Sequence, residues 1–505
     1  MKKIFYFTLI LLLLFAFSSI SMAQEQVIRV ALTYDSKTFD PANAQSVSSA
    51  QVMNNIFSRL IDYKFGTAEL EGDLSKEWSV TDDGMVYTFV LKEGVQFHKG
   101  YGEMTAEDVK YTFDRLLSPD LVASEKSFYK DIDHVETEGD YTVKIYMKNS
   151  NTSFPHILAR ASSSILSKKA SEEFEGEIAQ NPIGTGPFEF VKWTPQQETV
   201  VKAFDDYHKG RAQLDRVIFI PIPDPSTLSS AFRSGNVDII QVTDPNWYQQ
   251  FKEDAKYKIS QTPALNTRFI GFNVDIEPFD DIRVRKAMQY GFNKKSLLEN
   301  VLPGISTPAN GPFAPDTFGY EPDVTKYDYN PEKAKELLAE AGYPDGFQTT
   351  LYVPNIDRFT IPAQVYQSDM KKIGIDLNIQ IMETSTFLDK AGRGETPVFS
   401  LSRGHTPLPI RLAYSWFHPD NKNKGGNYGQ YDNPEMTNLI DELRDSLKMD
   451  KIDSLLGEIQ KLAADEAVYL YIDYEDNIYA MQSHVNGFKS DPFRSLRMYE
   501  TSLSN

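Results

Sequence analysis

Strand-like segments recur along the chain, and segments with helical periodicity separate many of them. The strand patterns lie at residues 27–32, 86–91, 143–147, 217–222 and 268–273. This alternation predicts a mixed α/β chain. A chain of 505 residues is too long for one ordinary hydrophobic core, so we expect two or three domains.

Three helices are indicated by their ends or by their periodicity. The first has Asp224 as a possible cap and Pro225 at a position that suits the first helical turn. The second begins at Pro331 and stops at Gly342. The third, over residues 452–464, carries apolar residues on one face, which is more typical of a core-facing helix than of an interaction stripe.

Two irregular stretches interrupt this pattern, at residues 261–267 and 474–478. Both are candidates for crossings between two lobes. Two such crossings would form a hinge.

The stretch NPIGTGPFEFVKW, residues 181–193, looks at first like a glycine-rich phosphate loop. A phosphate loop needs a helix after it, because the helix N-terminus supplies free N–H groups. Here Gly186 leads instead into an alternating segment typical of a half-buried strand. We therefore interpret Gly184 and Gly186 as a tight turn into a strand.

The first 23 residues predict export from the cytoplasm. Lys2 and Lys3 precede a short apolar run, and Ser21-Met22-Ala23 offers a small-x-small cleavage pattern. The run is short for a membrane span, so we expect cleavage and a mature chain that starts near Gln24. The chain has no cysteine, hence no disulfide, no thiol nucleophile and no site for a lipid anchor. These features predict a free periplasmic protein.

The charge balance argues against nucleic acid as a partner. The formal net charge is -19, whereas phosphate binding requires clustered Lys and Arg. After the export signal no further long apolar stretch occurs, so we expect no membrane insertion of the mature chain. We also expect a monomer.

No motif for a reactive centre stands out. The seven histidines are scattered, without an HExxH pattern, and no GxSxG elbow occurs. Asp280 and Asp281 offer one carboxylate pair for hydrolysis, but a helix cap and first-turn acid is the simpler interpretation. We therefore expect no catalytic residues, no metal and no cofactor, and we favour binding over catalysis.

Several stretches together resemble one family. They include GTGPFEFVKW, EWSVTDDGMVYTFVLKEGVQFHKG, FIGFNVDIEPFDDIRVRKAMQYGFNKKSLL and YNPEKAKELLAEAGYPDGF, in that family's order over nearly all of the mature chain. They resemble the extracellular solute-binding proteins of the dipeptide, oligopeptide and nickel group. The resemblance implies a two-lobed α/β periplasmic binding protein with a hinge and an extra N-terminal subdomain, which closes over a small-molecule ligand and delivers it to the permease of an ABC importer.

The same resemblance implies a division of the chain. Residues 1–23 are the signal peptide, 24–60 and 184–264 belong to lobe I, 61–183 form its extra subdomain, 265–475 form lobe II, and 476–505 return to lobe I.

The ligand site departs from the peptide-binding pattern. Peptide-binding relatives carry acidic residues for the peptide ammonium in a stretch resembling GWxxDxxDP, whereas residues 400–417 contain no Asp or Glu. With Gly404 on the family glycine, His405 replaces the tryptophan, and Leu408 and Arg411 replace the two acids. An ammonium buried without a carboxylate would lose its charge-assisted hydrogen bonds, which makes ordinary dipeptides doubtful ligands.

Basic and aromatic residues in this stretch favour a different ligand. Arg403 and Arg411 suit an anion, while Tyr414, Trp416 and Phe417 could stack on a sugar or another flat surface. The competing interpretation pairs the arginines with the protein's own acids and places the aromatics in the core.

Three more residues are candidates for ligand contact. Arg358 lies near the position at which peptide-binding relatives place an arginine for the ligand carboxylate. Trp247 and Tyr248 follow a predicted strand and could face the cleft from lobe I.

Our first hypothesis is therefore a transport receptor for a small organic solute, with peptides as the family default and anionic or sugar-like ligands favoured by the missing acid. One alternative is an exported hydrolase that uses a carboxylate pair. Another is a sensory or scaffold protein that signals to a membrane partner.

Overall fold

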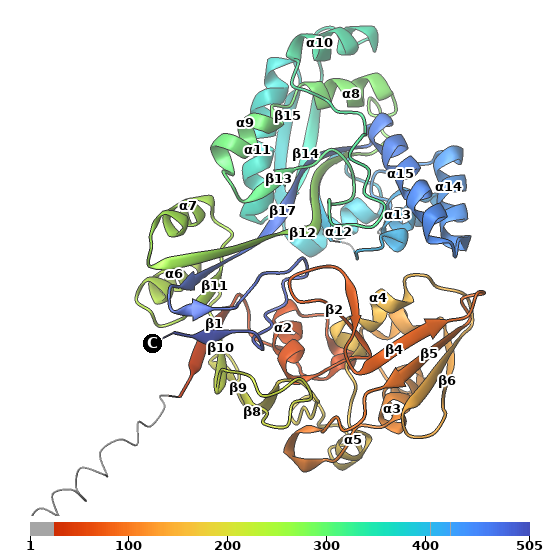
Figure 1. The fold of residues 1–505 in the computed structure, drawn as a ribbon. Helices are drawn as coiled ribbons and strands as arrows, with labels where there is room; N and C mark the ends of the chain where they lie inside the picture. Colours follow the sequence, from red (N-terminus) through yellow and green to blue (C-terminus); the bar gives the residue numbers. More distant parts are fainter. Residues whose placement is uncertain (1–24, 405, 425, 505) are drawn as a thin grey trace, which may run out of the picture.

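The computed structural model describes residues 25–404, 406–424 and 426–504. The signal-peptide prediction and His405 lie outside these residues. Figure 1 shows two lobes joined by long strands, with a smaller sheet and its helices beside the lower lobe. Among the residues that the structure describes, none of the helices is both long and apolar enough to cross a bilayer.

An 11-stranded sheet runs through both lobes of the described chain. Its order is β15-β14-β16-β12-β17-β11-β1-β10-β9-β8, with β13 paired to β17. In lobe I, β1 pairs in parallel with β10 and β11. In lobe II, β14 pairs in parallel with β15 and β16.

Lobe I is built from separate parts of the chain, because one core joins side chains from the N-terminal, middle and C-terminal segments. Its strands are β1 (Val27–Leu32), β8 (Phe188–Thr194), β9 (Glu198–Ala203), β10 (Arg216–Pro221) and β11 (Ile239–Gln241), with β18 (Val485–Asn486) and β19 (Ser502–Leu503) near the C-terminus. Its helices are α2 (Val47–Ile56), α6 (Pro225–Arg233) and α7 (Pro245–Glu253). The predicted cap of α6 is confirmed, since Asp224 Oδ1 accepts a hydrogen bond from Thr227 N at 2.8 Å.

The extra subdomain has its own antiparallel sheet, in the order β4-β5-β7-β6, and its own hydrophobic core. Its strands are β4 (Ser75–Val80), β5 (Val86–Leu91), β6 (Ile132–Thr137) and β7 (Thr142–Met147), and the short pair β2 (Ile61–Tyr63) and β3 (Leu70–Gly72) leads into them. Its helices are α3 (Ala106–Leu117), α4 (Phe154–Leu158) and α5 (Lys168–Glu173), with the 3-10 helix η3 (Lys126–Tyr129).

Lobe II packs helices on both faces of its part of the sheet, around two hydrophobic cores. Its strands are β13 (Ser306–Pro308), β14 (Gln348–Pro354), β15 (Asp376–Met382) and β16 (Val398–Gly404). Its helices are α8 (Ile282–Tyr290), α9 (Lys294–Ser296), α10 (Pro331–Glu340), α11 (Asp357–Lys372), α12 (Thr384–Gly392), α13 (Ile410–Phe417), α14 (Pro434–Asp445) and α15 (Met449–Asp465). The predicted helices at Pro331 and at residues 452–464 are confirmed as α10 and α15.

Two long antiparallel strands connect the lobes: β12 (Tyr257–Phe272) and β17 (Tyr469–Gln482). Their pairing loses its regular register between Pro263 and Thr267, within one of the two stretches predicted to cross between lobes. A break in the ladder is a natural position for bending, because the backbone there is not fixed by continuous pairing. The domain boundaries given above stay predictions.

The GTGPF stretch is a turn, as predicted, and not a phosphate loop. A Cβ atom at Gly184 would collide with the Ile56 carbonyl at the end of α2, and one at Gly186 would meet Ile56 C at 2.6 Å. Gly186 N also donates to Ile56 O at 2.9 Å, and strand β8 follows. The glycines thus permit two backbones to approach closely. Asp281 likewise caps α8 by accepting from Arg283 N at 2.8 Å, which confirms its interpretation as a cap.

Candidate functional site

Two large cavities are lined by charged side chains. The first, here called the interlobe cleft, has a volume of about 860 Å³ and is lined by residues of lobe I, the extra subdomain and lobe II. The second, here called the α3–α5 groove, has a volume of about 690 Å³ and lies between α3, α5 and the segment that follows α5. Their charges distinguish them.

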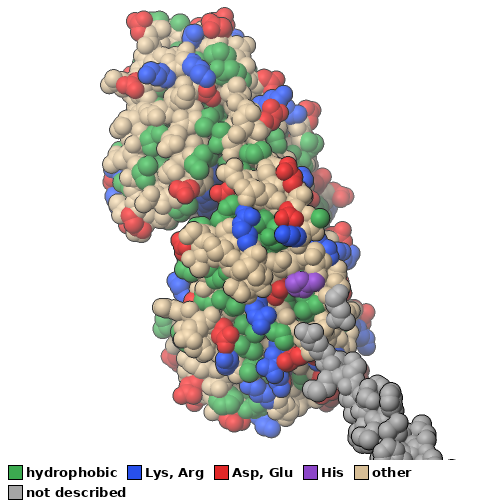
Figure 2. Space-filling view, turned by 90° about the vertical axis from the view of Figure 1, so that its left-hand side faces the viewer, with side chains coloured by type: hydrophobic (Ala, Val, Ile, Leu, Met, Phe, Trp, Pro, Cys, Tyr) green, Lys and Arg blue, Asp and Glu red, His purple; other side chains and the backbone are tan. Residues whose placement is uncertain are grey.

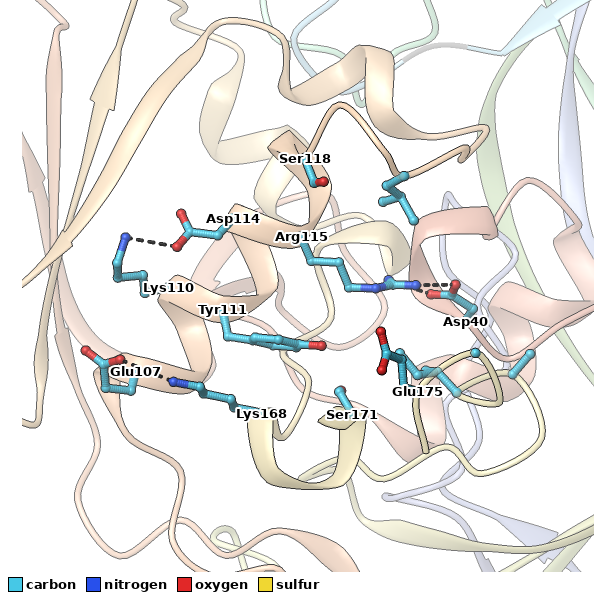
Figure 3. A pocket seen from close by; sticks show the side chains of 14 residues that line it. Asp40, Glu107, Lys110, Tyr111, Asp114, Arg115, Ser118, Lys168, Ser171 and Glu175 are labelled. Carbon is cyan, nitrogen blue, oxygen red and sulfur yellow. Dashed lines mark hydrogen bonds and ion pairs between the residues drawn. The ribbon is translucent and has the colours of Figure 1, made fainter. Parts of the chain in front are cut away.

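Figure 3 shows the α3–α5 groove, in which acids and bases pair with one another. Arg115 forms two hydrogen bonds with Asp40, at 2.9 and 2.7 Å. Lys110 lies 2.9 Å from Asp114. Lys168 lies 4.0 Å from Glu107. Each base of this lining therefore has an acidic partner, which leaves little net charge to attract an ion.

The interlobe cleft is strongly cationic. Among its described lining residues Glu125 is the one acid, against seven arginines: Arg59, Arg160, Arg358, Arg403, Arg411, Arg494 and Arg497. Asp62 and Glu475 stand behind the wall and pair with some of these arginines, and the arginines still exceed the carboxylates. The described lining of the cleft is therefore positively charged, whereas the net charge of the whole chain is -19. On the face shown in Figure 2, acidic and basic side chains are interspersed over both lobes.

Helix α13 presents Arg411 to the cleft. Trp416 and Phe417, five and six residues further along, are buried in the core of lobe II and anchor the opposite side of the helix. The Arg411 guanidinium carbon lies 4.6 Å from the centroid of the Phe128 ring, which belongs to the extra subdomain. Among the described residues, no carboxylate lies within ion-pair distance of Arg411. Partial desolvation in the cleft and the positive charge of Arg160 lower the pKa of Arg411 below its ordinary value.

Arg403 and Arg358 line the same cleft from lobe II. Arg403, on β16, donates to Ser415 Oγ at 2.9 Å, and its guanidinium lies 4.7 Å from the centroid of the Tyr428 ring. Arg358 lies 3.5 Å from Glu475 Oε2, and desolvation lowers its pKa. The structure thus brings together Arg358, Arg403 and Arg411, and their contact with ligand stays a prediction.

The comparison with known families identifies the chain. The model of the bacterial extracellular solute-binding proteins, family 5 Middle, matches residues 69–424. The chain belongs to this family. Such proteins are the substrate-binding components of ABC importers, so this solute-binding protein captures a small solute and works with a membrane permease. The family is non-catalytic, which leaves the hydrolase alternative without support.

Similar proteins cover between 72% and 95% of the chain but differ in their named ligands. Heme-binding protein A of Haemophilus influenzae is 29% identical over 498 residues, covering 92% of this chain and 90% of that protein. Glutathione-binding protein GsiB of Salmonella paratyphi A is 32% identical over 371 residues, covering 72% and 70%. The structure of HbpA2 from Haemophilus parasuis matches with a TM-score of 0.87 at 26% identity, covering 95% of this chain and 100% of that one.

The aromatic candidates of this solute-binding protein lie elsewhere. Trp416 and Phe417 are core residues, as the competing interpretation held, and neither is among the described residues that line the cleft. Tyr414 donates to Asp420 Oδ2 at 3.0 Å and stacks on His418, outside the cleft lining.

The two lobe I candidates also lie outside the cleft lining. Tyr248 is buried in a small core of lobe I and donates to Gln261 Oε1 at 2.8 Å. Trp247 packs against the same core.

Sequence reasoning missed the lobe I wall of the cleft. Arg59 and Arg497 share Asp62, at 3.0 and 2.5 Å. Arg160 pairs with Glu125 at 2.6 Å, and its guanidinium carbon lies 4.0 Å from the Phe128 ring centroid. No local motif marks these residues, since they are far apart in sequence and meet only when the lobes form.

Groups that could hold a metal are not gathered anywhere in the described chain: no cluster of three or more His, Asp or Glu side chains is placed to bind one. The cleft contains His156, whose Nδ1 lies 3.2 Å from the Tyr63 hydroxyl. Burial lowers the pKa of His156 to about 4, so this imidazole is neutral at neutral pH. The positive charge of the described lining therefore comes from arginine.

Proposed function

We propose that this protein captures an anionic organic solute in the interlobe cleft and presents it to its permease in the periplasm. The observation that supports this most is the excess of arginine over carboxylate in the described lining. Guanidinium groups suit carboxylates and phosphates, because their planar donors can form two parallel hydrogen bonds. A partly desolvated arginine gains most from such a partner when no carboxylate of the protein pairs with it, and among the described residues Arg411 has none within ion-pair distance.

A zwitterionic peptide fits this lining less well. The described lining offers one carboxylate, Glu125, and that group is bonded to Arg160. A peptide ammonium would have to displace this arginine or stay without a charged partner. Heme and glutathione, which appear in the names of two relatives, both carry net negative charge at neutral pH.

The cleft also offers aromatic faces, though not those expected from the sequence. Tyr63 and Phe493 stack on each other with ring centroids 4.1 Å apart, and both line the cleft together with Phe128. Aromatic faces suit a flat or apolar part of a ligand. We therefore infer an anionic solute with an apolar or planar portion.

Native mass spectrometry of the gently purified mature protein tests this proposal, followed by denaturation and identification of any released molecule. We expect a molecule with net negative charge at pH 7. A released cation or ordinary dipeptide would contradict the proposal. If the protein is empty, titration calorimetry with reduced glutathione, dialanine and N-acetyl-dialanine decides: tighter binding of dialanine than of both anions would also contradict it.

A further inference from the structure

One aromatic ring joins the two walls of the interlobe cleft. Phe128 lies in η3 of the extra subdomain. Its ring centroid lies 4.0 Å from the guanidinium carbon of Arg160, in the same subdomain, and 4.6 Å from that of Arg411, on α13 of lobe II. Both distances are typical of cation-π contacts. Phe128 is therefore a contact between the extra subdomain and lobe II at the ligand cleft.

The position of Phe128 is fixed by its neighbours. The adjacent Tyr129 is buried, and its hydroxyl lies 2.7 Å from both Ser162 Oγ and Ser163 Oγ. Glu125, just before η3, is buried as well and donates its N–H to Ala42 O at 3.2 Å. The ring thus stands on a hydrogen-bonded base that does not depend on lobe II.

The two guanidinium groups around Phe128 differ in their charge compensation. Arg160 pairs with Glu125 at 2.6 Å. Arg411 has no carboxylate within ion-pair distance among the described residues, and the two guanidinium carbons lie within about 9 Å of each other because both are close to one ring. A guanidinium in a cation-π contact makes no hydrogen bond to the ring, so its N–H donors stay available for a planar anion.

We propose that Phe128 is a positioning residue for ligand recognition: its ring holds Arg411 of lobe II against the extra subdomain, so that closure aims the guanidinium edge at the ligand's anionic group. The anion in this proposal rests on the proposed function. The contact between Phe128 and Arg411 does not, and it can be measured in the ligand-free protein.

A second contact between the same two parts of the molecule supplies a reporter of closure. Thr152 Oγ1, in the extra subdomain, donates to Ser446 O, between α14 and α15, at 3.2 Å. Because the chain has no cysteine, a Thr152→Cys/Ser446→Cys pair would be its only thiols. The rate at which this pair forms a disulfide under a fixed concentration of oxidised dithiothreitol then reports how often the cleft closes.

The experiment compares that rate in ligand-free protein carrying Phe128→Leu, Phe128→Tyr, Arg411→Lys, Arg411→Gln, or Phe128→Leu with Arg411→Gln. We expect Phe128→Leu and Arg411→Gln each to slow cross-linking about 3- to 10-fold, which corresponds to the strength of a partly desolvated cation-π contact. Phe128→Tyr should stay within about 2-fold of the parent because it keeps the ring. The double variant should be no slower than either single one, since both remove the same contact.

Two results would overturn the proposal: parent-like rates in Phe128→Leu, or multiplied effects in the double variant. Arg411→Lys guards against misfolding, because this exposed side chain keeps a cation that can still contact the ring. It should slow cross-linking less than Arg411→Gln does, at an unchanged melting temperature, and a loss larger than that of Arg411→Gln would contradict the proposal. Lys168→Gln, in the α3–α5 groove, is the matched control. If the ligand is not an anion, the proposed function is wrong, but the cross-linking rates still test the contact between Phe128 and Arg411.

Discussion

The interlobe cleft and the α3–α5 groove are similar in volume, at about 860 and 690 Å³, and both are lined by charged side chains. In the groove, Arg115, Lys110 and Lys168 each lie beside a carboxylate of the same lining. In the part of the cleft that the structure describes, seven arginines face one lining acid. Volume alone therefore does not mark a ligand site. An excess of charge that the protein does not compensate is the better indication of a ligand site, because a ligand can supply the missing partner.

Reversing one charge in each cavity should have the largest effect. We expect Arg411→Glu to weaken binding of the co-purified ligand at least 100-fold, about 3 kcal/mol, because an acid replaces a cation that faces the ligand. Lys168→Glu in the groove should change affinity less than 2-fold. Titration calorimetry measures both. Equal losses in the two variants would remove the distinction between the cavities.

Removing one acid from each cavity should lower the stability of the protein in both cases but change ligand affinity in only one. Glu125→Gln leaves Arg160 without its buried partner and should lower the free energy of unfolding by about 2 kcal/mol. Asp40→Asn should lower it similarly, since Arg115 loses two hydrogen bonds. Urea unfolding measures the loss. Of the two variants, only Glu125→Gln should change the affinity for an anion, and it should raise that affinity. A loss of affinity as large as that of Arg411→Glu would show instead that Glu125 binds a cationic group of the ligand.

Acid should affect the cleft through His156. Burial lowers its pKa to about 4, below the ordinary value of 6.5, so between these two pH values the unfolded chain holds a proton that the folded chain lacks. The stability that comes from the neutral imidazole is present above pH 6.5 and is lost as pH falls towards 4. At pH 5 this loss amounts to about 2 kcal/mol, and His156→Phe should abolish it.

Urea unfolding at pH 7 and pH 5 measures this difference. If His156→Phe and the parent lose stability in parallel, His156 is not the group responsible.

Salt should have the smallest effect. Raising NaCl from 50 to 500 mM should weaken anion binding by a few-fold, because the cleft is partly open to solvent and its arginines are partly screened. The dependence should be shallower in Arg411→Gln and unchanged in Lys168→Gln. A shallower dependence in Lys168→Gln as well would mean that the groove contributes to attracting the ligand.

Local sequence patterns were sufficient for much of the fold. The start of α6, both ends of α10, the cap of α8 and the turn at Gly184 and Gly186 depend on residues that are neighbours in sequence, and the sequence predicts each of them. Arg411 was singled out because it stands where relatives have an acid, and it does line the cleft.

The same stretch shows where sequence reasoning failed. Trp416 and Phe417 were candidate ligand contacts, but they occupy the side of α13 that faces the core. The helical spacing from Arg411 already placed them on another face, about 140° and 240° around the helix. That spacing could have separated core from cleft had the limits of α13 been predicted.

The sequence by itself determined the α/β class, the family and most local turns and caps, because these depend on periodicity and on residues close together in the chain. The tertiary structure decided which charges are compensated. Glu125 pairs with Arg160, whereas Arg411, from another lobe, contacts Phe128 and has no carboxylate within ion-pair distance among the described residues. Such differences cannot be read from composition, since the energy of a charge depends on its distance from other charges and on its exposure to water.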